Sequence, residues 1–282
     1  MSFTGELSGG TETGRLVARL RAAGCVFAED EAALLLTEAG SPGELEHLVG
    51  RRVAGEPLEH LLGWAQFGDL RVCVRPGVFV PRARSLTLVD GALAVMRPGD
   101  VVLDLCCGTG AIGAVLQHTV PSAQVYAADI DERAAACARE NLSTAGGDPG
   151  RVYVGDLYAP LPGELRGRVA VLVVNAPYVP TDEIAFMPVE AREHEDRVAL
   201  DGGPDGSALH RRSVAGAGDW LAPGGVLLIE TGRRQASLVA ALMDGAGLAA
   251  RVVHDDDRDG TVVQGVRPAP SVGSGGGVSP GN

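Results

Sequence analysis

One stretch of the chain, residues 101–113, limits its possible folds more than any other. It begins with the apolar run Val101 to Leu105, passes through Cys106-Cys107-Gly108-Thr109-Gly110, and ends in small residues that suit a helix. A buried strand, a glycine turn and a helix in this order are typical of an α/β fold. Glycines let backbone approach a ligand closely at the start of a helix, so we expect a nucleotide-like ligand at this turn.

The same turn argues against a pyrophosphate ligand. Gly108 to Gly113 match the letters of the dinucleotide fingerprint Gly-x-Gly-x-x-Gly. However, no arginine or lysine follows the turn, and Asp104 stands near the end of the preceding strand. A carboxylate in this place suits a cofactor with a cationic amino-acid portion, and we therefore predict that Asp104 contacts such a cofactor.

Two further acids follow the next expected strands. The strand expected at residues 124–131 carries Asp129, about twenty positions after the glycines, where a carboxylate can accept two ribose hydroxyls. The strand at residues 151–155 precedes Asp156 and Leu157, which we expect to bracket an adenine ring. Each acid alone could equally be a solvated cap or turn residue. Three acids at successive strand ends favour a ligand site, because open α/β sheets bind ligands at the carboxyl ends of their strands.

A later apolar run, Val169 to Val174, leads into Asn175-Ala176-Pro177-Tyr178. The Asn175 side chain and the Ala176 carbonyl are neutral acceptors that can converge on the hydrogens of one nitrogen. Pro177 stiffens the backbone after them, and Tyr178 can cover a flat ligand. These residues predict a pocket for a planar amide or amino group, although asparagine and proline are also ordinary residues of a loop leaving a strand.

The order of these motifs resembles that of class I S-adenosylmethionine-dependent methyltransferases. Within that superfamily the chain resembles the HemK/PrmC-type protein glutamine methyltransferases, which methylate the side-chain amide of the Gln in a Gly-Gly-Gln loop of peptide chain release factors. The resemblance covers roughly residues 15–267. The other segments that carry it are Arg52 to Gly63, Phe67-Gly68, Val80-Pro81-Arg82, Ala199 to Gly206, Leu221 to Gly225 and Glu230-Thr231-Gly232.

The resemblance implies a Rossmann-like domain with a mostly parallel seven-stranded sheet that includes an antiparallel strand. It also implies S-adenosylmethionine as cofactor, a release factor as protein substrate, and no metal. The residues expected to bind the cofactor are Asp104, Cys106, Cys107, Gly108, Thr109, Gly110, Asp129, Asp156, Leu157 and Asn175. The residues expected to act in catalysis are Asn175, Ala176, Pro177 and Tyr178.

The chain divides into four expected regions. Residues 1–62 are expected to be helical, because apolar residues recur at helical spacing near 13–24, 29–39 and 42–53. The resemblance implies that they form a substrate-recognition domain. Residues 63–84 alternate as a β-hairpin linker, and residues 85–267 form the methyltransferase domain. Residues 268–282 are a disordered tail rich in glycine, proline and serine. The acid-rich stretch at 180–201 is expected to be a loop that either covers the substrate or is simply solvated.

Two departures from the family pattern bear on the substrate. The family usually has Asn-Pro-Pro-Tyr, whereas Ala176 replaces the first proline here. The family also tends to have Pro-Arg-Pro-x-Thr-Glu where this chain reads Pro81-Arg82-Ala83-Arg84-Ser85-Leu86. These differences keep two alternatives open, namely methylation of another amide or amino group on a small molecule or adenine, and a non-catalytic cofactor-binding protein.

Composition limits the partners. A net charge of −12 argues against direct nucleic-acid binding, since phosphate contacts need lysine and arginine. Six arginines in residues 51–84 either form a docking strip for a negatively charged partner or are simply solvated. Five cysteines without a CxxC pair indicate neither a disulfide framework nor a zinc site. No apolar run is long enough to span a membrane and no signal pattern opens the chain, so we expect a cytoplasmic protein. We expect a monomer, and the sequence itself leaves the oligomeric state open.

Overall fold

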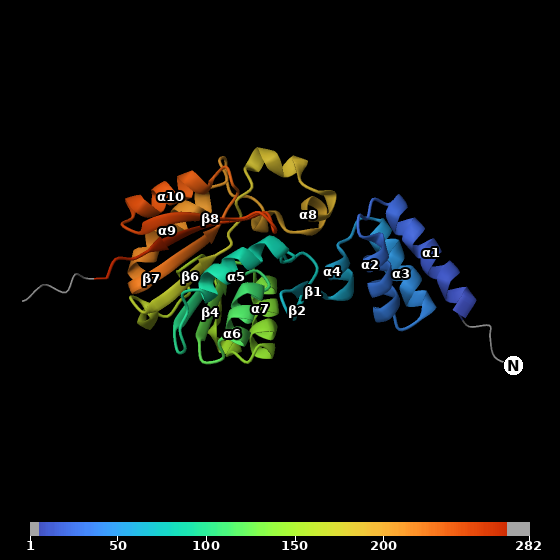
Figure 1. Cartoon of the computed structure of the whole chain (residues 1–282), viewed down its shortest axis with the longest axis horizontal. Coiled ribbons are helices and arrows are strands. Elements are labelled where there is room, and N and C mark those ends of the chain that lie inside the picture. Colours follow the sequence, from blue (N-terminus) through green and yellow to red (C-terminus); the bar gives the residue numbers. More distant parts are fainter. Residues whose placement is uncertain (1–5, 270–282) are drawn as a thin grey trace, which may run out of the picture.

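The computed structural model describes residues 6–269 and shows a larger part, built on a sheet, joined to a smaller helical part (Figure 1). The sheet has seven strands in the order β5-β4-β3-β6-β7-β9-β8. Strand β9 runs antiparallel to both neighbours, and the other pairs are parallel, so the predicted sheet type is confirmed. The strands are β3 (Val101–Leu105), β4 (Gln124–Asp129), β5 (Val152–Val154), β6 (Val169–Val174), β7 (Leu221–Glu230), β8 (Ala249–Asp255) and β9 (Gly260–Val266).

Helices cover both faces of this sheet (Figure 1). One face packs against α5 (Leu86–Leu93), α6 (Ala111–Thr119) and α7 (Glu132–Thr144). The other packs against α9 (Ala208–Trp220) and α10 (Ala236–Gly245). Side chains alternate along a strand, so Val102 of β3 faces the first helix layer and Leu103 faces the second. This double cover explains why β6 reads as an unbroken apolar run and why β3 is interrupted only by Asp104.

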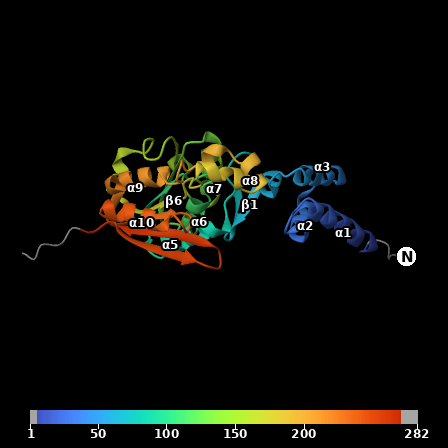
Figure 2. The ribbon, with the colours of Figure 1, turned by 90° about the horizontal axis from the view of Figure 1, so that it is seen from above.

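The helical part has an apolar core of its own, in which Leu20 and Leu35 are fully buried. It comprises α1 (Glu6–Ala22), α2 (Ala28–Glu38), α3 (Pro42–Val53) and α4 (Leu58–Leu62). Figure 2 shows α1, α2 and α3 at one end of the molecule, beyond β1. The connection is the predicted hairpin of β1 (Trp64–Phe67) and β2 (Leu70–Cys73), which begins directly after Gly63, a helix cap with a φ of 77°.

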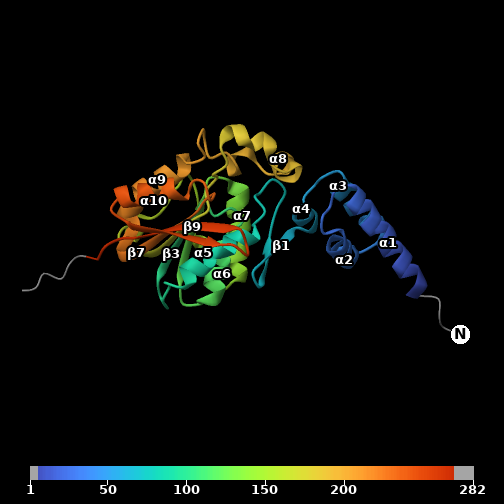
Figure 3. The same cartoon turned by 45° about the horizontal axis from the view of Figure 1, so that its top comes forward.

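The stretch between β6 and α9 differs from its prediction as a plain loop. It contains the 3₁₀ helices η4 (Thr181–Phe186) and η5 (Arg197–Ala199) and the helix α8 (Val189–His194) between them. Figure 3 shows α8 next to both the sheet part and the helical part. The buried guanidinium of Arg52 connects α8 to the helical part. It bonds Glu31 of α2 at 2.6 Å and Glu190 of α8 at 2.6 Å.

The six arginines of residues 51–84 form no free basic strip. Each has a glutamate partner: Arg51 pairs with Glu56, Arg52 with Glu31, Arg71 with Glu38, Arg75 with Glu140, Arg82 with Glu195 and Arg84 with Glu230. The predicted docking strip is therefore already neutralised within the chain.

Two further predictions concern the C-terminal tail and membrane-spanning helices. The predicted disordered tail lies outside the described residues, apart from positions 268 and 269. Between residues 6 and 269, no helix is long and apolar enough to cross a membrane.

Candidate active site

The carboxyl ends of β3, β4, β5 and β6 meet at a cavity of about 230 Å³. Its wall also includes Met187 and Leu200 from the stretch between β6 and α9. The predicted residues in the wall are Cys106, Cys107, Gly108, Thr109, Asp129, Asp156, Leu157, Asn175, Ala176, Pro177 and Tyr178. The structure thus brings together most of the residues singled out from the sequence, while Asp104 and Gly110 lie outside the wall.

The turn after β3 follows a course that glycine permits. Cys106, Gly108 and Gly110 have φ values of 55°, 54° and 69°. A Cβ on Gly108 would meet nothing within 4 Å, so this residue leaves open space at the cavity wall. A Cβ on Gly110 would lie 2.7 Å from the Cβ of Ala138 in α7. Gly110 therefore lets α6 and α7 approach each other where the turn enters α6.

Replacing Gly110 with alanine is expected to lower the free energy of unfolding by about 2–3 kcal/mol, from overpacking against α7 together with the cost of a positive φ. Gly108→Ala is the matched control, because it adds the same methyl at a similar φ with no neighbour to strike. Urea unfolding of both variants without cofactor measures the difference. Equal losses for the two variants would contradict the packing explanation.

Asp129, the last residue of β4, is fixed by two backbone hydrogen bonds. The N–H of Gly108 donates to Oδ2 at 2.8 Å, and the N–H of Asp131 donates to Oδ1 at 2.9 Å. Desolvation raises the pKa of Asp129, and these bonds oppose that rise. Each carboxylate oxygen can accept one more hydrogen bond, so the predicted contact with two ribose hydroxyls remains open to it.

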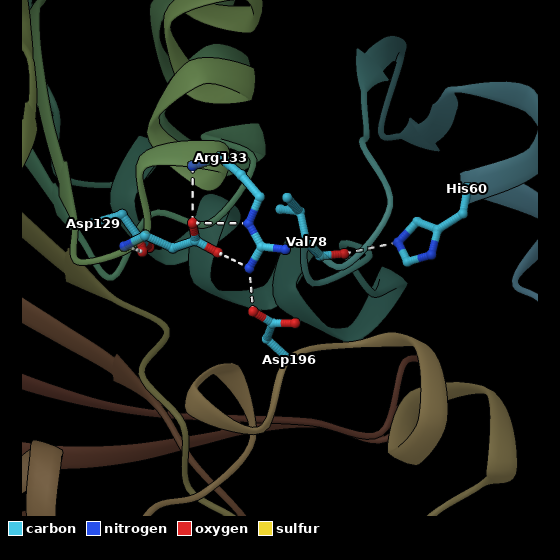
Figure 4. A network of polar contacts seen from close by, with 6 residues as sticks. His60, Val78, Asp129, Arg133 and Asp196 are labelled. Atoms are coloured by element: carbon cyan, nitrogen blue, oxygen red, sulfur yellow. Dashed lines mark hydrogen bonds and ion pairs between the residues drawn. The ribbon is translucent and has the colours of Figure 1, made fainter.

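Two separate groups of polar contacts lie between Asp129 and the helical part (Figure 4). The Arg133 guanidinium, in the first turn of α7, bonds Asp131 Oδ2 at 2.8 Å and also pairs with Asp196. Beyond it, the ring nitrogen Nε2 of His60 in α4 lies 2.9 Å from the carbonyl oxygen of Val78. Asp196 belongs to the stretch that carries α8, so the region of the predicted ribose site and that stretch are held together by one arginine.

Asp104 lies beneath the glycine turn. Side chains alternate along β3, so Asp104 faces the same way as Val102, toward α6. Its Oδ2 accepts from the N–H of Gly113 at 3.0 Å, and its buried Oδ1 has no partner. Desolvation raises the pKa of Asp104 to about 7. This carboxyl group is therefore placed to hold the start of α6. Asp104 lies outside the cavity wall, and its contact with a cofactor stays a prediction.

The raised pKa of Asp104 gives a prediction for stability against pH. The unfolded chain loses this proton near the ordinary aspartate pKa of about 4, whereas the folded chain keeps it until about 7. Over that interval the folded state binds more protons, so rising pH lowers the stability that Asp104 contributes. The difference in unfolding free energy between Asp104→Asn and wild type should move in favour of the variant by about 1–3 kcal/mol from pH 5 to pH 8. Urea unfolding without cofactor tests this, and a pH-independent difference would contradict it.

The predicted adenine residues flank the cavity at the end of β5. Asp156 is about half exposed and bonds the Arg212 guanidinium at 2.6 Å. Leu157 is buried and has a φ of 48°, a sparsely populated conformation for a residue with a side chain. One polar and one apolar side chain thus lie next to each other in the wall, as expected for a site that brackets a purine.

Asn175 follows β6 directly and is held from one side. Its Nδ2 donates to the hydroxyl oxygen of Ser85 at 3.1 Å. Within the described residues, Asn175 Oδ1 accepts no hydrogen bond, so this oxygen is available to a ligand. The next residue, Ala176, packs its methyl group into the core and is only 2% exposed. Asn175 and Ala176 both line the cavity, and their action as a pair of acceptors stays a prediction.

Tyr178 lies against a buried carboxylate. Its hydroxyl donates to Glu230 Oε1 at 3.3 Å, and its backbone carbonyl accepts from the side chain of Gln235 at 3.0 Å. The guanidinium carbon of Arg84 stands 5.9 Å from the centre of the Tyr178 ring. On the other side the ring neighbours His210, fully buried as a packing residue. Burial lowers the pKa of His210 to about 4, so its ring is neutral at pH 7.

Three side chains near this site carry no prediction from the sequence, namely Ser85, Arg133 and Arg212, and a fourth, Arg84, was considered only as part of a docking strip. Ser85 and Arg84 lie in the segment that departs from the family pattern, and this departure was the one feature of the sequence that could have marked them as site residues. Arg133 and Arg212 lie in helices, and no sequence motif around them identifies them as site residues. Their roles depend on partners 63 and 56 positions away along the chain.

Comparisons with known proteins agree with this geometry. The family model "Methyltransferase small domain" matches residues 69–191. The chain is 40% identical to a release factor glutamine methyltransferase of Mycolicibacterium smegmatis, over 78% of each chain. It is also 37% identical to a 4-amino-L-phenylalanine/4-methylamino-L-phenylalanine methyltransferase of Streptomyces pristinaespiralis, over 73% of this chain and 71% of that one. A methyltransferase structure from Pyrococcus furiosus shares the fold, with a TM-score of 0.54 and 16% identity over 71% of this chain and 90% of that one.

Proposed function

The chain belongs to the release factor glutamine methyltransferase family, and on that premise we propose that it transfers a methyl group from S-adenosylmethionine to the side-chain amide nitrogen of a glutamine in a peptide chain release factor. The observation that supports the proposal is that Asn175, whose Oδ1 accepts no hydrogen bond within the described residues, and Ala176 line the same cavity as the glycine turn. A glutamine amide has two hydrogens on one nitrogen, and this pair can accept both.

The residues of the cavity fit S-adenosylmethionine. Gly108 leaves space where any other residue would place a Cβ, so the turn can pass close to a ligand. Asp129 is held in place by backbone and retains acceptor capacity for ribose hydroxyls. Asp156 and Leu157 line the same cavity, which supports the proposal that they give the adenine ring one polar and one apolar contact. When bound, S-adenosylmethionine supplies an electrophilic methyl group on a sulfonium sulfur.

The protein's own contribution to methyl transfer is alignment. An amide nitrogen is a poor nucleophile, because its lone pair is delocalised into the carbonyl group. Hydrogen bonds from its N–H groups to Asn175 Oδ1 and to the Ala176 carbonyl turn the nitrogen toward the methyl group and stabilise the positive charge that grows on it. Tyr178 covers the flat face of the amide. This arrangement requires no strong general base, and the nearby His210 is buried against Tyr178 and neutral.

Exposed apolar side chains mark where a protein substrate would approach. Phe186 and Val189 are 87% and 52% exposed, and both belong to the stretch that contributes Met187 to the cavity wall. In the helical part, Phe27 is 68% exposed, next to α2, which Arg52 ties to α8. We propose that the helical part, residues 1–62, recognises the release factor while the sheet part carries out the reaction. The enzyme then works as a monomer in the cytoplasm, where translation takes place, and needs no direct contact with nucleic acid.

A second candidate is methylation of an amino group on a small molecule. The similarity to the 4-amino-L-phenylalanine methyltransferase favours it, as does Arg84, a cation in the cavity wall that remains 42% exposed beside its partner Glu230. A partly exposed guanidinium at this place could meet the carboxylate of an amino-acid substrate. The first candidate requires a glutamine of a protein as methyl acceptor, and the second requires an amino group of a small molecule. One assay with both kinds of acceptor distinguishes them.

The assay is transfer of labelled methyl from S-adenosylmethionine to purified release factors, next to 4-amino-L-phenylalanine as a small-molecule acceptor. The expected result is label on the release factor, and none when the glutamine of its Gly-Gly-Gln loop is changed. Label on the small molecule alone would favour the second candidate. Cofactor binding without label on either acceptor would contradict both.

A further inference from the structure

Residues 181–199, from η4 to η5, form a strap along one side of the cavity. Met187, Val198 and Ala199 of this strap line the same cavity as Gly108 of the glycine turn and Asp129 of β4. Part of the wall around the expected cofactor site therefore comes from a segment that lies outside the sheet. The place of the strap decides how closely this wall encloses a ligand.

The sheet part holds the C-terminal end of the strap. The N–H of Val80 donates to Oε1 of the buried Glu195 at 3.2 Å, and the N–H of Asp196 donates to the carbonyl oxygen of Gly77 at 3.1 Å. Arg133, which also bonds Asp131 beside the predicted ribose site, pairs with Asp196 (Figure 4). These contacts fix one end of the strap at the cavity.

The helical part holds α8, in the middle of the strap (Figure 3). Arg52 of α3 is 6% exposed, and its Nη1 lies 2.6 Å from Oε1 of Glu190. The same guanidinium donates to Glu31 through Nε at 2.6 Å and through Nη2 at 3.1 Å. Its planar fork of donors allows both contacts at once. Glu31 alone supplies one full counter-charge to the buried cation, so the contact with Glu190 serves to connect α8 to the helical part.

We propose that Arg52 is a positioning residue: through Glu190 it holds the strap in the cavity wall and so couples the helical part to the affinity for S-adenosylmethionine. Without this contact, α8 is released at its middle, and Met187, two residues before it, can leave the wall. Such a coupling is reciprocal, so a bound cofactor also stabilises the orientation of the helical part. This role deepens the proposed function, and its kinetic test rests on that function.

The first test uses the cofactor alone. Glu190→Ala removes the contact with the strap and leaves the two bonds between Arg52 and Glu31 in place, so the helical part should stay folded. We expect the Kd for S-adenosylmethionine, measured by isothermal titration, to rise about three- to tenfold. Backbone amides of residues 187–194 should exchange hydrogen faster than in wild type.

Glu193→Ala is the matched control for this test. It removes the same charge from the same helix, and Glu193 pairs with its neighbour Arg192 inside α8. The affinity for S-adenosylmethionine and the amide exchange of the strap should both stay as in wild type. Equal affinities in wild type and Glu190→Ala, or equal losses in the two variants, would overturn the inference.

A second variant tests the contact from the side of the helical part. Arg52→Lys keeps a positive charge for Glu31 but lacks the fork that reaches Glu190 at the same time. It should therefore weaken binding of S-adenosylmethionine about as much as Glu190→Ala. The double variant should bind no more weakly than the weaker single variant, because both changes break one contact. Losses that add up in the double variant would contradict the coupling.

The kinetic test uses methyl transfer to a release factor. Glu190→Ala should raise KM for S-adenosylmethionine with little change in kcat, because the strap encloses the cofactor before and during the reaction alike. A lower kcat with unchanged KM would overturn the inference. A wild-type protein that labels no release factor contradicts the proposed function instead, and the titrations with S-adenosylmethionine still decide the role of Arg52.

Discussion

Replacing Asn175 with alanine is expected to lower kcat/KM for methyl transfer to a release factor by about 10²- to 10³-fold, the usual cost of removing one group that stabilises a transition-state charge. The loss should appear mainly in kcat, because the hydrogen bond to the substrate nitrogen strengthens as positive charge grows on it. Steady-state kinetics with labelled S-adenosylmethionine measure both parameters.

Two controls distinguish this chemistry from a folding defect. Asn175 makes one side-chain hydrogen bond, to Ser85, and is only partly buried, so the alanine variant should unfold at nearly the same urea concentration as wild type. Asn141→Ala is the matched contrast: that amide is buried and bonds three backbone groups, so its removal should destabilise the fold. An Asn175→Ala enzyme with unchanged kcat would remove the acceptor pair from the mechanism.

The sequence predicted the sheet and the glycine turn because their signals are local. The apolar runs at β3, interrupted only by Asp104, and at β6 reflect burial on both faces, and Pro42 with Ser41 as cap marks the start of α3. Helix α4 was missed, since it is one short turn of five residues with no periodicity to detect. Helix α8 was missed for the same reason, and the acids around it suggested a solvated loop.

The candidate site was predicted in part, and the rest depends on contacts between distant segments. The acids at the ends of β4 and β5, Asp129 and Asp156, reach the cavity because strand order places the carboxyl ends of these strands together. The pairing of Arg84 with Glu230 joins residues 146 positions apart, and nothing in either segment indicates the other. Asp104 was expected to contact the cofactor from its place near a strand end; its side chain lies beneath the turn and accepts from the N–H of Gly113, and the cofactor contact stays a prediction.

Replacing Asp129 with asparagine is expected to weaken binding of S-adenosylmethionine at least about 100-fold, because hydrogen bonds to a charged group contribute about 1.5–3 kcal/mol each and two ribose hydroxyls depend on this carboxylate. The variant also damages the turn. Both carboxylate oxygens accept from backbone N–H groups, of Gly108 and Asp131. An asparagine NH₂ group must face one of these donors and leave it without a partner.

Isothermal titration with S-adenosylmethionine and with its demethylated product tests this expectation. Asp219→Asn is the matched control, since it removes the same charge from an exposed side chain of α9. Loss of binding confined to Asp129→Asn would show that the position of the carboxylate matters and not the net charge of the protein. Equal affinities for wild type and Asp129→Asn would mean that the ribose lies elsewhere in the cavity. In that case Asp131, the other carboxylate of the wall beside β4, would be the next candidate.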